Sequence, residues 1–464
     1  MILRLVCVFL LVVIPAARAN PLTLEEVLRS SARHAPQILE AIARQKQADA
    51  RLLSARGQFD LLFEAETQAR PAGYYDGSYI EGRAVQPLTN NGGNVYAGYR
   101  VSDGSFANYD GKSVTSRLGE IKAGLVFSLL RDRLTDERRT RIALAERDRE
   151  LAALDRGAVA IGIQRRAVEA YQQWVAAGLR VQIFRDLLML ATERQVSIEK
   201  LVGSGARPAI LAVENRQNLI RRQGLLTRAE QDLAIQANTL SLYLRDAAGN
   251  PLVPETNRLP GKLASLDFPN QADLANWRQN RPDLQALRVR IEQANARIQL
   301  AQNDLRPRLD LRIEASQDMG ATGLPSFGRS QTEAIVGLRF SVPLQQRQPE
   351  GRLAEAGAEA EALRLRQRLT EDQITVEINN LHRQVTGAEQ LASLAANEVE
   401  LAKRMSEAER RRFALGASDF FLVNQREEAA ADARVREVDA YYRVGAGHAE
   451  LAAALADRGR LSLD

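Results

Sequence analysis

The chain has 464 residues, of which 26% are charged and 5% aromatic, and its formal net charge is +5. Arg4 and Arg18 lie in the segment from Met1 to Ala19, so the rest of the chain carries +3, close to neutral for its length. Acidic and basic residues alternate along the helical stretches, as on solvated helix faces, rather than forming a basic nucleic-acid footprint. We therefore expect no nucleic acid among the partners.

The segment 1–19 has the order of a cleavable secretory signal. A charged start at Arg4 precedes an apolar run from Leu5 to Pro15, and the small-residue site Ala17-Arg18-Ala19 follows. The run is too short to span a bilayer as a helix, and no later stretch of about 20 uninterrupted apolar residues exists to do so. We predict a secreted chain whose mature form starts near Asn20.

Cysteine and histidine content leaves few ligands for a metal or a cofactor. Cys7, the only cysteine, lies inside the predicted signal, so the mature chain has no disulfide, no thiolate metal site and no lipid-modified cysteine. His34, His382 and His448 are far apart in sequence, and we interpret each as a polar surface residue. No phosphate-binding glycine loop or nucleophile motif appears. The prediction is a protein that is not an enzyme, with no cofactor and no metal.

Residues 20–250 form a first repeat that begins with a helix and a strand hairpin. Polar and apolar residues alternate from Leu61 to Gln68 and from Ile121 to Leu129, which indicates two strands at about 60–130. The Gly-, Asn-, Asp- and Tyr-rich stretch between Glu64 and Gly119 is interpreted as a long loop. Strands of this length, apolar on one face, suit an outer-membrane barrel, and a soluble half-buried sheet stays as the alternative.

A long helical hairpin follows the strands. The helix from about Arg131 to Val202 spans roughly 100 Å at about 1.5 Å per residue. It ends at the glycine break Gly203-Ser204-Gly205, and a second helix returns with leucines at heptad spacing. These are Leu219, Leu226, Leu233 and Leu240. The first repeat therefore closes with two antiparallel helices and a tip near 203–205.

The second repeat, 271–464, has the same order of elements after a proline-rich linker at 251–270. A strand hairpin is expected at about 308–344, a long helix from about Gly351 to Leu415, a tip near Gly416 and a returning helix. Matching segments support the duplication. His34-Ala35-Pro36 recurs as Asn280-Arg281-Pro282 at an offset of 246, Gly124 to Ser128 recurs as Gly337 to Ser341 at an offset of 213, and Gly205-Ala206 recurs as Gly416-Ala417 at an offset of 211.

The long helices carry one coiled-coil seam in both repeats. Apolar residues follow a strict 4-3 spacing, and the matching position of the first repeat, at an offset of 211, is apolar in every case. In the second repeat the seam is Ile374, Ile378, Leu381, Val385, Ala388, Ala392, Ala395, Val399 and Ala402. In the first it is Ile163, Ala167, Ala170, Trp174, Ala177, Val181, Phe184, Leu188 and Ala191.

The duplicated order resembles the TolC family of outer-membrane efflux proteins over essentially the whole mature chain. The resemblance rests on Arg281-Pro282-Asp283-Leu284 with Ala294 and Ala296, on Phe340-Ser341-Val342-Pro343-Leu344, and on the glycine-led tips at Gly205 and Gly416. It implies a mainly α fold with a transmembrane β part, in which long coiled-coil helices and strand hairpins form a duplicated unit. Three chains would form a 12-stranded β-barrel, continued by an α-helical periplasmic barrel. Four strands per chain agree with that count.

The resemblance further implies the exit duct of a tripartite efflux pump or a type I secretion system. The protein would be a homotrimer in the outer membrane, in contact with its lipid and extending into the periplasm. An inner-membrane pump and a periplasmic adaptor would be its partners. The adaptor would dock on the tips, and the alternative is that the tip glycines only permit a tight turn. The tip residues are Gly203, Ser204, Gly205, Ala206, Gly416, Ala417 and Ser418.

The closed end of the tunnel is expected just beyond the tips. The resemblance assigns Asp419, Asn424 and Gln425 to the constriction, and their alternative interpretation is as solvated helix positions. Two other protein classes remain. A periplasmic adaptor should carry one hairpin inside small β domains, and a structural coiled coil would explain neither the secretory signal nor the strands.

Overall fold

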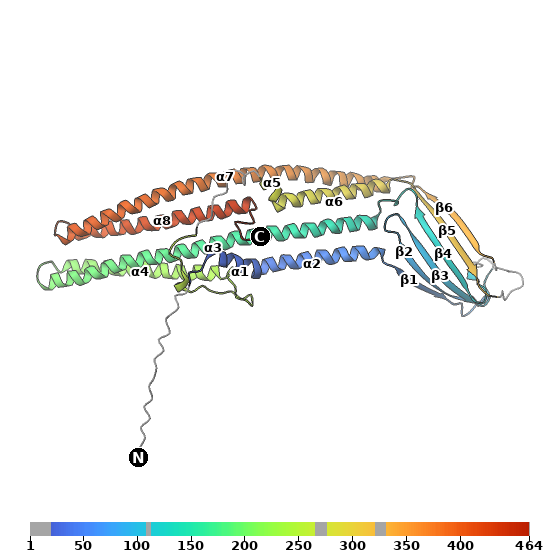
Figure 1. Ribbon diagram of the computed structural model, residues 1–464, viewed down its shortest axis with the longest axis horizontal. Coiled ribbons are helices and arrows are strands. Elements are labelled where there is room, and N and C mark those ends of the chain that lie inside the picture. The colour runs from blue at the N-terminus through green and yellow to red at the C-terminus, as the bar shows by residue number, and fades with distance from the viewer. Residues whose placement is uncertain (1–19, 108–112, 265–275, 321–330, 464) are drawn as a thin grey trace, which may run out of the picture. The chain divides into compact units, whose positions relative to one another are not determined.

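The computed structural model describes residues 20–107, 113–264, 276–320 and 331–463 (Figure 1). The predicted secretory signal, with Cys7, lies outside the described residues. Contacts divide the chain into two compact units. Unit 1 comprises Met1–Leu39, Val159–Asn280 and Thr375–Asp464, and unit 2 comprises Glu40–Ala158 and Arg281–Ile374. No helix in the described part of the chain is both long enough and apolar enough to span a membrane.

The chain runs twice through one order of elements: helices, strands, a long helix and a returning helix. The first pass contains α1 (Leu24–His34), α2 (Pro36–Arg56), η1 (Gly57–Phe59), four strands, α3 (Glu137–Gly203) and α4 (Ile210–Leu240). A connection with η3 (Thr256–Arg258) leads to the second pass. This contains α5 (Trp277–Asn280), α6 (Pro282–Asp304), two strands, α7 (Arg347–Ala414) and α8 (Phe420–Ala454).

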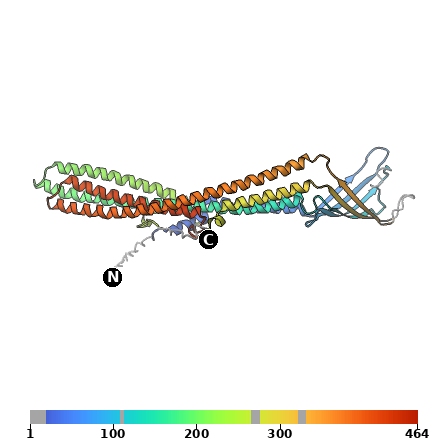
Figure 2. The same cartoon turned by 90° about the horizontal axis from the view of Figure 1, so that it is seen from above.

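The strands of unit 2 form a single antiparallel sheet whose spatial order is the chain order (Figure 1). The sheet curves when it is viewed from above (Figure 2). Its six strands are β1 (Leu62–Gln68), β2 (Ser78–Pro87), β3 (Gly93–Asp103), β4 (Glu120–Ser128), β5 (Arg308–Asp318) and β6 (Glu333–Ser341).

The predicted count of four strands per chain is wrong, because the sheet contains six. The stretch interpreted as a long loop contains the hairpin β2–β3, which lies in the sheet between β1 and β4. The sequence signal was weak because Gly82 and Gly98 interrupt the alternation of these strands. Here glycine allows close approach of neighbouring strands: a Cβ on Gly98 would lie 3.1 Å from the Gly82 carbonyl oxygen.

Four helical segments of unit 2 lie next to the sheet in the order α2, α3, α6, α7 (Figure 1). Each neighbouring pair is joined by polar contacts and, between α2 and α3, by Leu52, Ala55 and Ala145. One contact per pair shows the order: Arg149 Nε to Asp49 Oδ1 at 2.8 Å, Gln293 Nε2 to Asp148 Oδ1 at 2.7 Å, and Arg297 Nη1 to Glu359 Oε1 at 2.6 Å.

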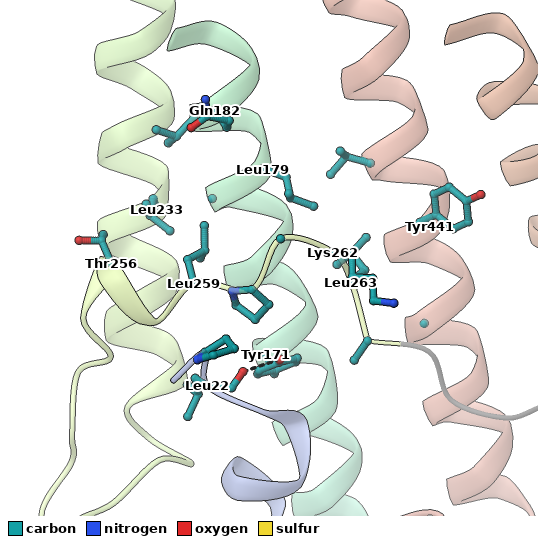
Figure 3. Close-up of a pocket in the computed structure, with 18 of the residues that line it drawn as sticks. Leu22, Tyr171, Leu179, Gln182, Leu233, Thr256, Leu259, Lys262, Leu263 and Tyr441 are labelled. Atoms are coloured by element: carbon teal, nitrogen blue, oxygen red, sulfur yellow. Dashed lines mark hydrogen bonds between the residues drawn. The ribbon is translucent and has the colours of Figure 1, made fainter. Parts of the chain in front are cut away.

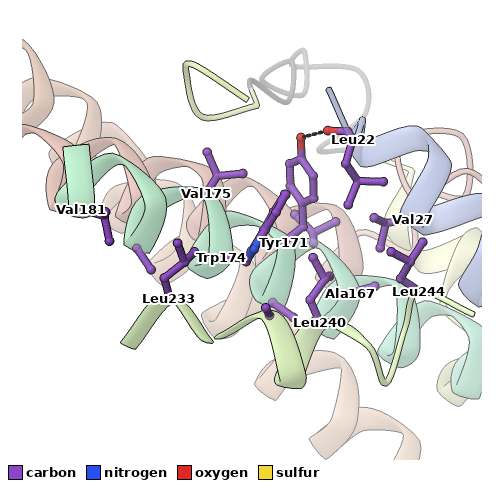
Figure 4. Packing of buried hydrophobic residues seen from close by; sticks show 14 of the residues in the cluster. Leu22, Val27, Ala167, Tyr171, Trp174, Val175, Val181, Leu233, Leu240 and Leu244 are labelled. Carbon is purple, nitrogen blue, oxygen red and sulfur yellow. Dashed lines mark hydrogen bonds between the residues drawn. The ribbon is translucent and has the colours of Figure 1, made fainter. Parts of the chain in front are cut away.

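The core of unit 1 is the predicted coiled-coil seam (Figure 4). Trp174 and Leu240 are fully buried where α3 packs on α4, and alanines between them allow the two helices to approach closely. All seam positions predicted in α3 and α7 are buried or half-buried. The seam prediction is therefore confirmed in both repeats.

The N-terminal segment and the linker pack against this core. The Tyr171 hydroxyl donates to the Leu22 carbonyl at 2.8 Å, and the Leu22 amide donates to the Arg258 carbonyl at 2.8 Å. Leu259 covers Gly178 so closely that a Cβ on this glycine would collide with the leucine side chain. The described part of the predicted linker, 251–264, contains no α-helix.

One histidine departs from the predicted surface position. His448 on α8 is buried, and its Nε2 lies 3.1 Å from Glu389 Oε1 on α7. The alanines and glycines around it in sequence are typical of a helix face with little room for a ring. The ring is nevertheless accommodated between the two helices of the second hairpin, where it pairs with Glu389.

The buried Tyr171 predicts a specific alkaline instability. Burial raises the pKa of Tyr171 to about 12, because the phenolate would lose its hydration. The folded chain therefore holds this proton more tightly than the unfolded chain, and stability falls as the pH rises from about 10 towards 12. Tyr171→Phe should lower the free energy of unfolding by about 1 kcal/mol at pH 8, since it loses one hydrogen bond.

The difference in the free energy of unfolding between the wild-type protein and Tyr171→Phe should be smaller at about pH 10.5 than at pH 8. At the higher pH, only the wild type must keep a phenol protonated at this position in order to stay folded. Urea unfolding of the detergent-solubilised protein at the two pH values measures it. Tyr441→Phe, at a side chain 45% exposed, is the control. An equal difference at both pH values would contradict the assignment.

Candidate functional site

The sheet has one apolar face, and this face is exposed. Cross-strand partners share a face, so the register places the alternating apolar residues of all strands on the same side. Phe63 and Val336 are each 71% exposed, and Leu338 is 68% exposed. Large apolar side chains exposed over a whole sheet mark a surface that meets lipid or protein. The other large ones are Ile80, Val95, Tyr99, Ile121, Ile313 and Phe340.

The opposite face is charged, and the ion pairs that link its central strands β2, β3 and β4 are shielded. Arg100 on β3 lies 2.5 Å from Glu120 on β4, and Lys122 pairs with Glu81 on β2. These four side chains are only 14–16% exposed. Further pairs extend across the sheet: Arg83 with Glu64 and Arg312 with Glu314, each at 2.6 Å. A water-soluble sheet buries its apolar face, whereas this sheet exposes that face and shields the central ion pairs of the charged one.

The two hairpin tips have the same backbone geometry. Gly205 and Gly416 adopt positive φ values of 73° and 77°, which favour glycine. At the first tip the Ala206 amide donates to the Leu201 carbonyl at 2.9 Å, and at the second the Ala417 amide donates to the Arg412 carbonyl at 2.8 Å. These bonds satisfy carbonyls in the last turns of α3 and α7.

The predicted tip residues lie together in these two turns. Six of them are exposed: Gly203, Ser204, Gly205, Ala206, Gly416 and Ala417. Ser418 is half-buried, and its hydroxyl donates to Glu409. A Cβ added at either positive-φ glycine would meet no atom within 4 Å, so their surroundings are open. Adaptor docking at these turns stays a prediction.

The three predicted constriction residues have different environments. Asp419 is the N-cap of α8, and its Oδ1 accepts from the Leu422 amide at 2.7 Å. Gln425 is exposed, whereas Asn424 is buried, and the Asn424 Oδ1 accepts from Arg194 Nη1 at 2.7 Å. Within one chain, Asn424 therefore lies between helices rather than on a surface, because an arginine of the neighbouring hairpin binds its amide oxygen.

A buried ionic cluster surrounds Asn424 and joins the two hairpins near their tips. Glu427 on α8 pairs with Arg194 on α3 and, at 3.1 Å, with Arg222 on α4. The side chains of Arg222 and Glu427 are 0% exposed, and that of Arg194 is 9% exposed. Burial lowers the pKa of Arg222, because desolvation disfavours the charged guanidinium, and Glu427 opposes that shift.

Sequence reasoning missed this cluster, although a signal was present. Arg222 is three residues after Leu219 and four before Leu226. It therefore lies on the same helix face as the leucines predicted at heptad spacing in the returning helix. Glu427 likewise continues a seam-like row of buried residues along α8 that begins at Phe420. A charged residue at a seam position predicts a buried partner of opposite charge.

A cavity of about 1760 Å³ lies between the first hairpin and α8 in unit 1 (Figure 3). Leu22, Leu259 and Leu263 contribute its apolar lining, and Lys262 and Tyr441 are among its polar residues. The linker crosses this cavity in Figure 3. None of the predicted tip or constriction residues lines it, so the cavity is separate from the predicted sites.

Comparisons with known proteins connect these surfaces to one family. The family described as outer membrane efflux protein matches residues 274–457, almost all of the second repeat. No curated protein matches the sequence of the chain. In fold, the chain is similar to the outer membrane protein VceC from Vibrio cholerae, with a TM-score of 0.65 and 16% identity, over 93% of this chain and 96% of that chain.

Two further outer-membrane channels share the fold. The open-state MtrE channel of Neisseria gonorrhoeae is 14% identical with a TM-score of 0.66, over 93% of this chain and 88% of that chain. The CmeC channel of Campylobacter jejuni is 14% identical with a TM-score of 0.63, over 93% and 85%. At this identity the likeness shows the fold. The second repeat thus matches the outer membrane efflux protein family, and the chain shares the fold of outer-membrane channels.

Proposed function

We propose that this protein is the outer-membrane exit duct of a tripartite efflux pump or a type I secretion system. The observation that carries the proposal is the sheet, which exposes its apolar face and shields the central ion pairs of its charged face. Lipid would contact the first and water in a bore would contact the second. The duct forms and breaks no bonds; it lets substrate pass to the exterior.

The partners follow from this role. The duct is a homotrimer, since one chain contributes only an arc of the wall. A periplasmic adaptor docks on the two exposed glycine turns, which present open surroundings and backbone groups at the ends of the hairpins. An inner-membrane pump supplies the energy. A periplasmic adaptor or a structural coiled coil is the alternative function, but neither needs a sheet that exposes its apolar face.

We propose that the buried ionic cluster keeps the constriction closed, and we call this cluster the lock. Arg194, Arg222 and Glu427 hold the first hairpin against α8 close to the tips, and Asn424 accepts from both arginines. Opening the constriction would separate these hairpins and hydrate the cluster. Asp419 and Gln425 lie beside it and remain the proposed lining of the constriction.

The duct itself is tested by conductance across a planar bilayer. Protein purified from outer membranes in detergent should be trimeric and should give discrete conductance steps. The charged sheet face predicts a water-filled path, so ions should pass without an energy source. A soluble product that does not conduct would support the adaptor or structural alternatives.

Tip docking is tested at Gly203, which is exposed and where an added Cβ would have no atom within 4 Å. Gly203→Trp should weaken adaptor binding by about ten-fold or more, because the bulky ring would obstruct the docking surface. Gly224→Trp, at an equally open glycine on α4 away from the tip, is the matched control. Binding of purified trimer to its adaptor, and export in cells, measure the effect. Equal binding by both variants would exclude docking at this turn.

The lock is tested by Glu427→Gln. Removing the buried carboxylate leaves two arginines without their partner, which should cost about 3 kcal/mol of hairpin packing. The expected result is a larger single-channel conductance with trimer levels unchanged. Glu398→Gln is the control, since Glu398 pairs with Arg436 on the surface, where both side chains are about half exposed. If both variants conduct as the wild type does, the cluster is not a lock.

A further inference from the structure

One charged group in the cavity of unit 1 has no partner in the described part of the chain. Glu437 on α8 lines the cavity and is half-buried, and its carboxylate forms neither an ion pair nor a hydrogen bond with the residues that the structure describes. We propose that this cavity binds a hydrophobic organic cation, with the positive charge against Glu437 and the apolar groups against α3, α4 and the linker. The site is additional to the proposed duct and does not depend on it.

The cavity is large enough for a small molecule, and several elements contribute to its walls. Its volume of about 1760 Å³ exceeds the roughly 300–1,000 Å³ that is usual for ligand pockets. In Figure 3, Leu259 and Leu263 of the linker lie between α3, which carries Leu179, and α8, which carries Tyr441. Leu233 of α4 also belongs to the lining. Apolar walls of this kind bind the hydrophobic groups of a ligand, and a charge placed among them selects the sign of its charge.

The other acidic and basic residues of the lining are hydrated or paired. Lys262 of the linker is exposed, so water stabilises its ammonium group. The rest already have partners within the chain, which leaves Glu437 as the charge that a ligand can meet without breaking a pair. The pairs are Arg185 with Glu230 at 3.3 Å, Arg434 with Asp186 at 3.0 Å, and His448 with Glu389 at 3.1 Å.

Partial burial leaves the Glu437 carboxylate poorly compensated. It raises the pKa of Glu437, because desolvation disfavours the charged form, and Arg434 opposes that shift. Arg434 is one turn away on α8, but its guanidinium binds Asp186 on α3. A cation in the cavity would supply the charge that this arrangement lacks, and the low polarity of the surrounding leucines would strengthen the attraction.

A second group with negative partial charge lies behind the lining. Gln172 on α3 is fully buried, and its Nε2 donates to the Ala264 carbonyl at 2.7 Å. A Cβ on Gly445 of α8 would lie 2.8 Å from the same Nε2, so the amide is held between two residues that line the cavity. The Gln172 Oε1 has no hydrogen-bond partner among the described residues. An unsatisfied amide oxygen and an unpaired carboxylate both favour a cation over an anion.

An aromatic ring adjoins the carboxylate. Tyr441 is four residues after Glu437 on α8, so the two side chains are neighbours on one helix face, and both line the cavity. The face of a tyrosine ring attracts organic cations such as quaternary ammonium ions. A metal ion would instead need several oxygen ligands. One carboxylate, one ring and a leucine lining therefore match an organic ammonium or phosphonium ion.

Equilibrium dialysis of the purified, detergent-solubilised protein tests the site, with uptake by protein-free micelles subtracted. The probes are tetraphenylphosphonium and tetraphenylborate, which have the same shape and opposite charges. Glu437→Gln should bind the cation at least about ten-fold more weakly than the wild type, because it keeps the side chain's size but loses its charge. The anion should bind Glu437→Gln at least as tightly as the wild type. Asp432→Asn removes an exposed carboxylate of α8 outside the lining and is the matched control.

Equal binding of the cation by Glu437→Gln and Asp432→Asn would overturn the proposal, and so would a wild type that binds no cation. A second variant leaves the carboxylate in place. Ala234 is an exposed residue of the lining, so Ala234→Trp should fill part of the cavity and weaken cation binding by about ten-fold or more without disturbing the packed core. Unchanged binding by this variant would place the cation outside the cavity. Bound cation should also raise the midpoint of thermal unfolding of the wild type more than that of either cavity variant.

Discussion

Backbone hydrogen bonding sets the strongest constraint on this molecule. A strand can lie in hydrocarbon only when every amide and carbonyl has a partner, and the sheet of unit 2 meets this demand at all but its two outer edges. The apolar face is exposed because lipid, not protein, would cover it. At the centre of the charged face, paired side chains such as Arg100 and Glu120 satisfy one another and are shielded.

The long helices are subject to a different constraint, which is close packing along their whole length. Helices as long as α3 and α7 need a continuous row of contacts and no bulky obstruction. Alanine-rich seams allow neighbouring helices to approach closely, and Trp174 is accommodated where α4 and the N-terminal segment enclose it (Figure 4). Because the chain is duplicated, both hairpins use the same kind of seam and the same tip turn, with positive φ at Gly205 and Gly416.

Periodic features could be predicted from the sequence, and isolated ones could not. The seams, the long helices and the glycine tips follow from repeated spacing, and two copies of each pattern reinforce one another. The hairpin β2–β3 has no counterpart among the described residues of the second repeat, and Gly82 and Gly98 made its composition resemble that of a loop. The burial of Asn424 depends on arginines of another hairpin. Only the three-dimensional packing of the hairpins reveals that partner.

The contacts between the helices are apolar around Trp174 and ionic near the tips, and this difference suits a duct that must open at one end. Around Trp174 the seam is apolar, and separating it would expose surface to water at a cost that grows with area. Near the tips the contact is ionic. A buried ion pair adds little net stability compared with apolar packing, because the cost of desolvating both charges offsets their attraction. Once one partner is displaced, however, the other charge is left unpaired, and the packed arrangement is strongly destabilised. Arg194, Arg222 and Glu427 can therefore hold the hairpins in one arrangement and release them when water enters, while the apolar seam keeps the rest of each hairpin assembled.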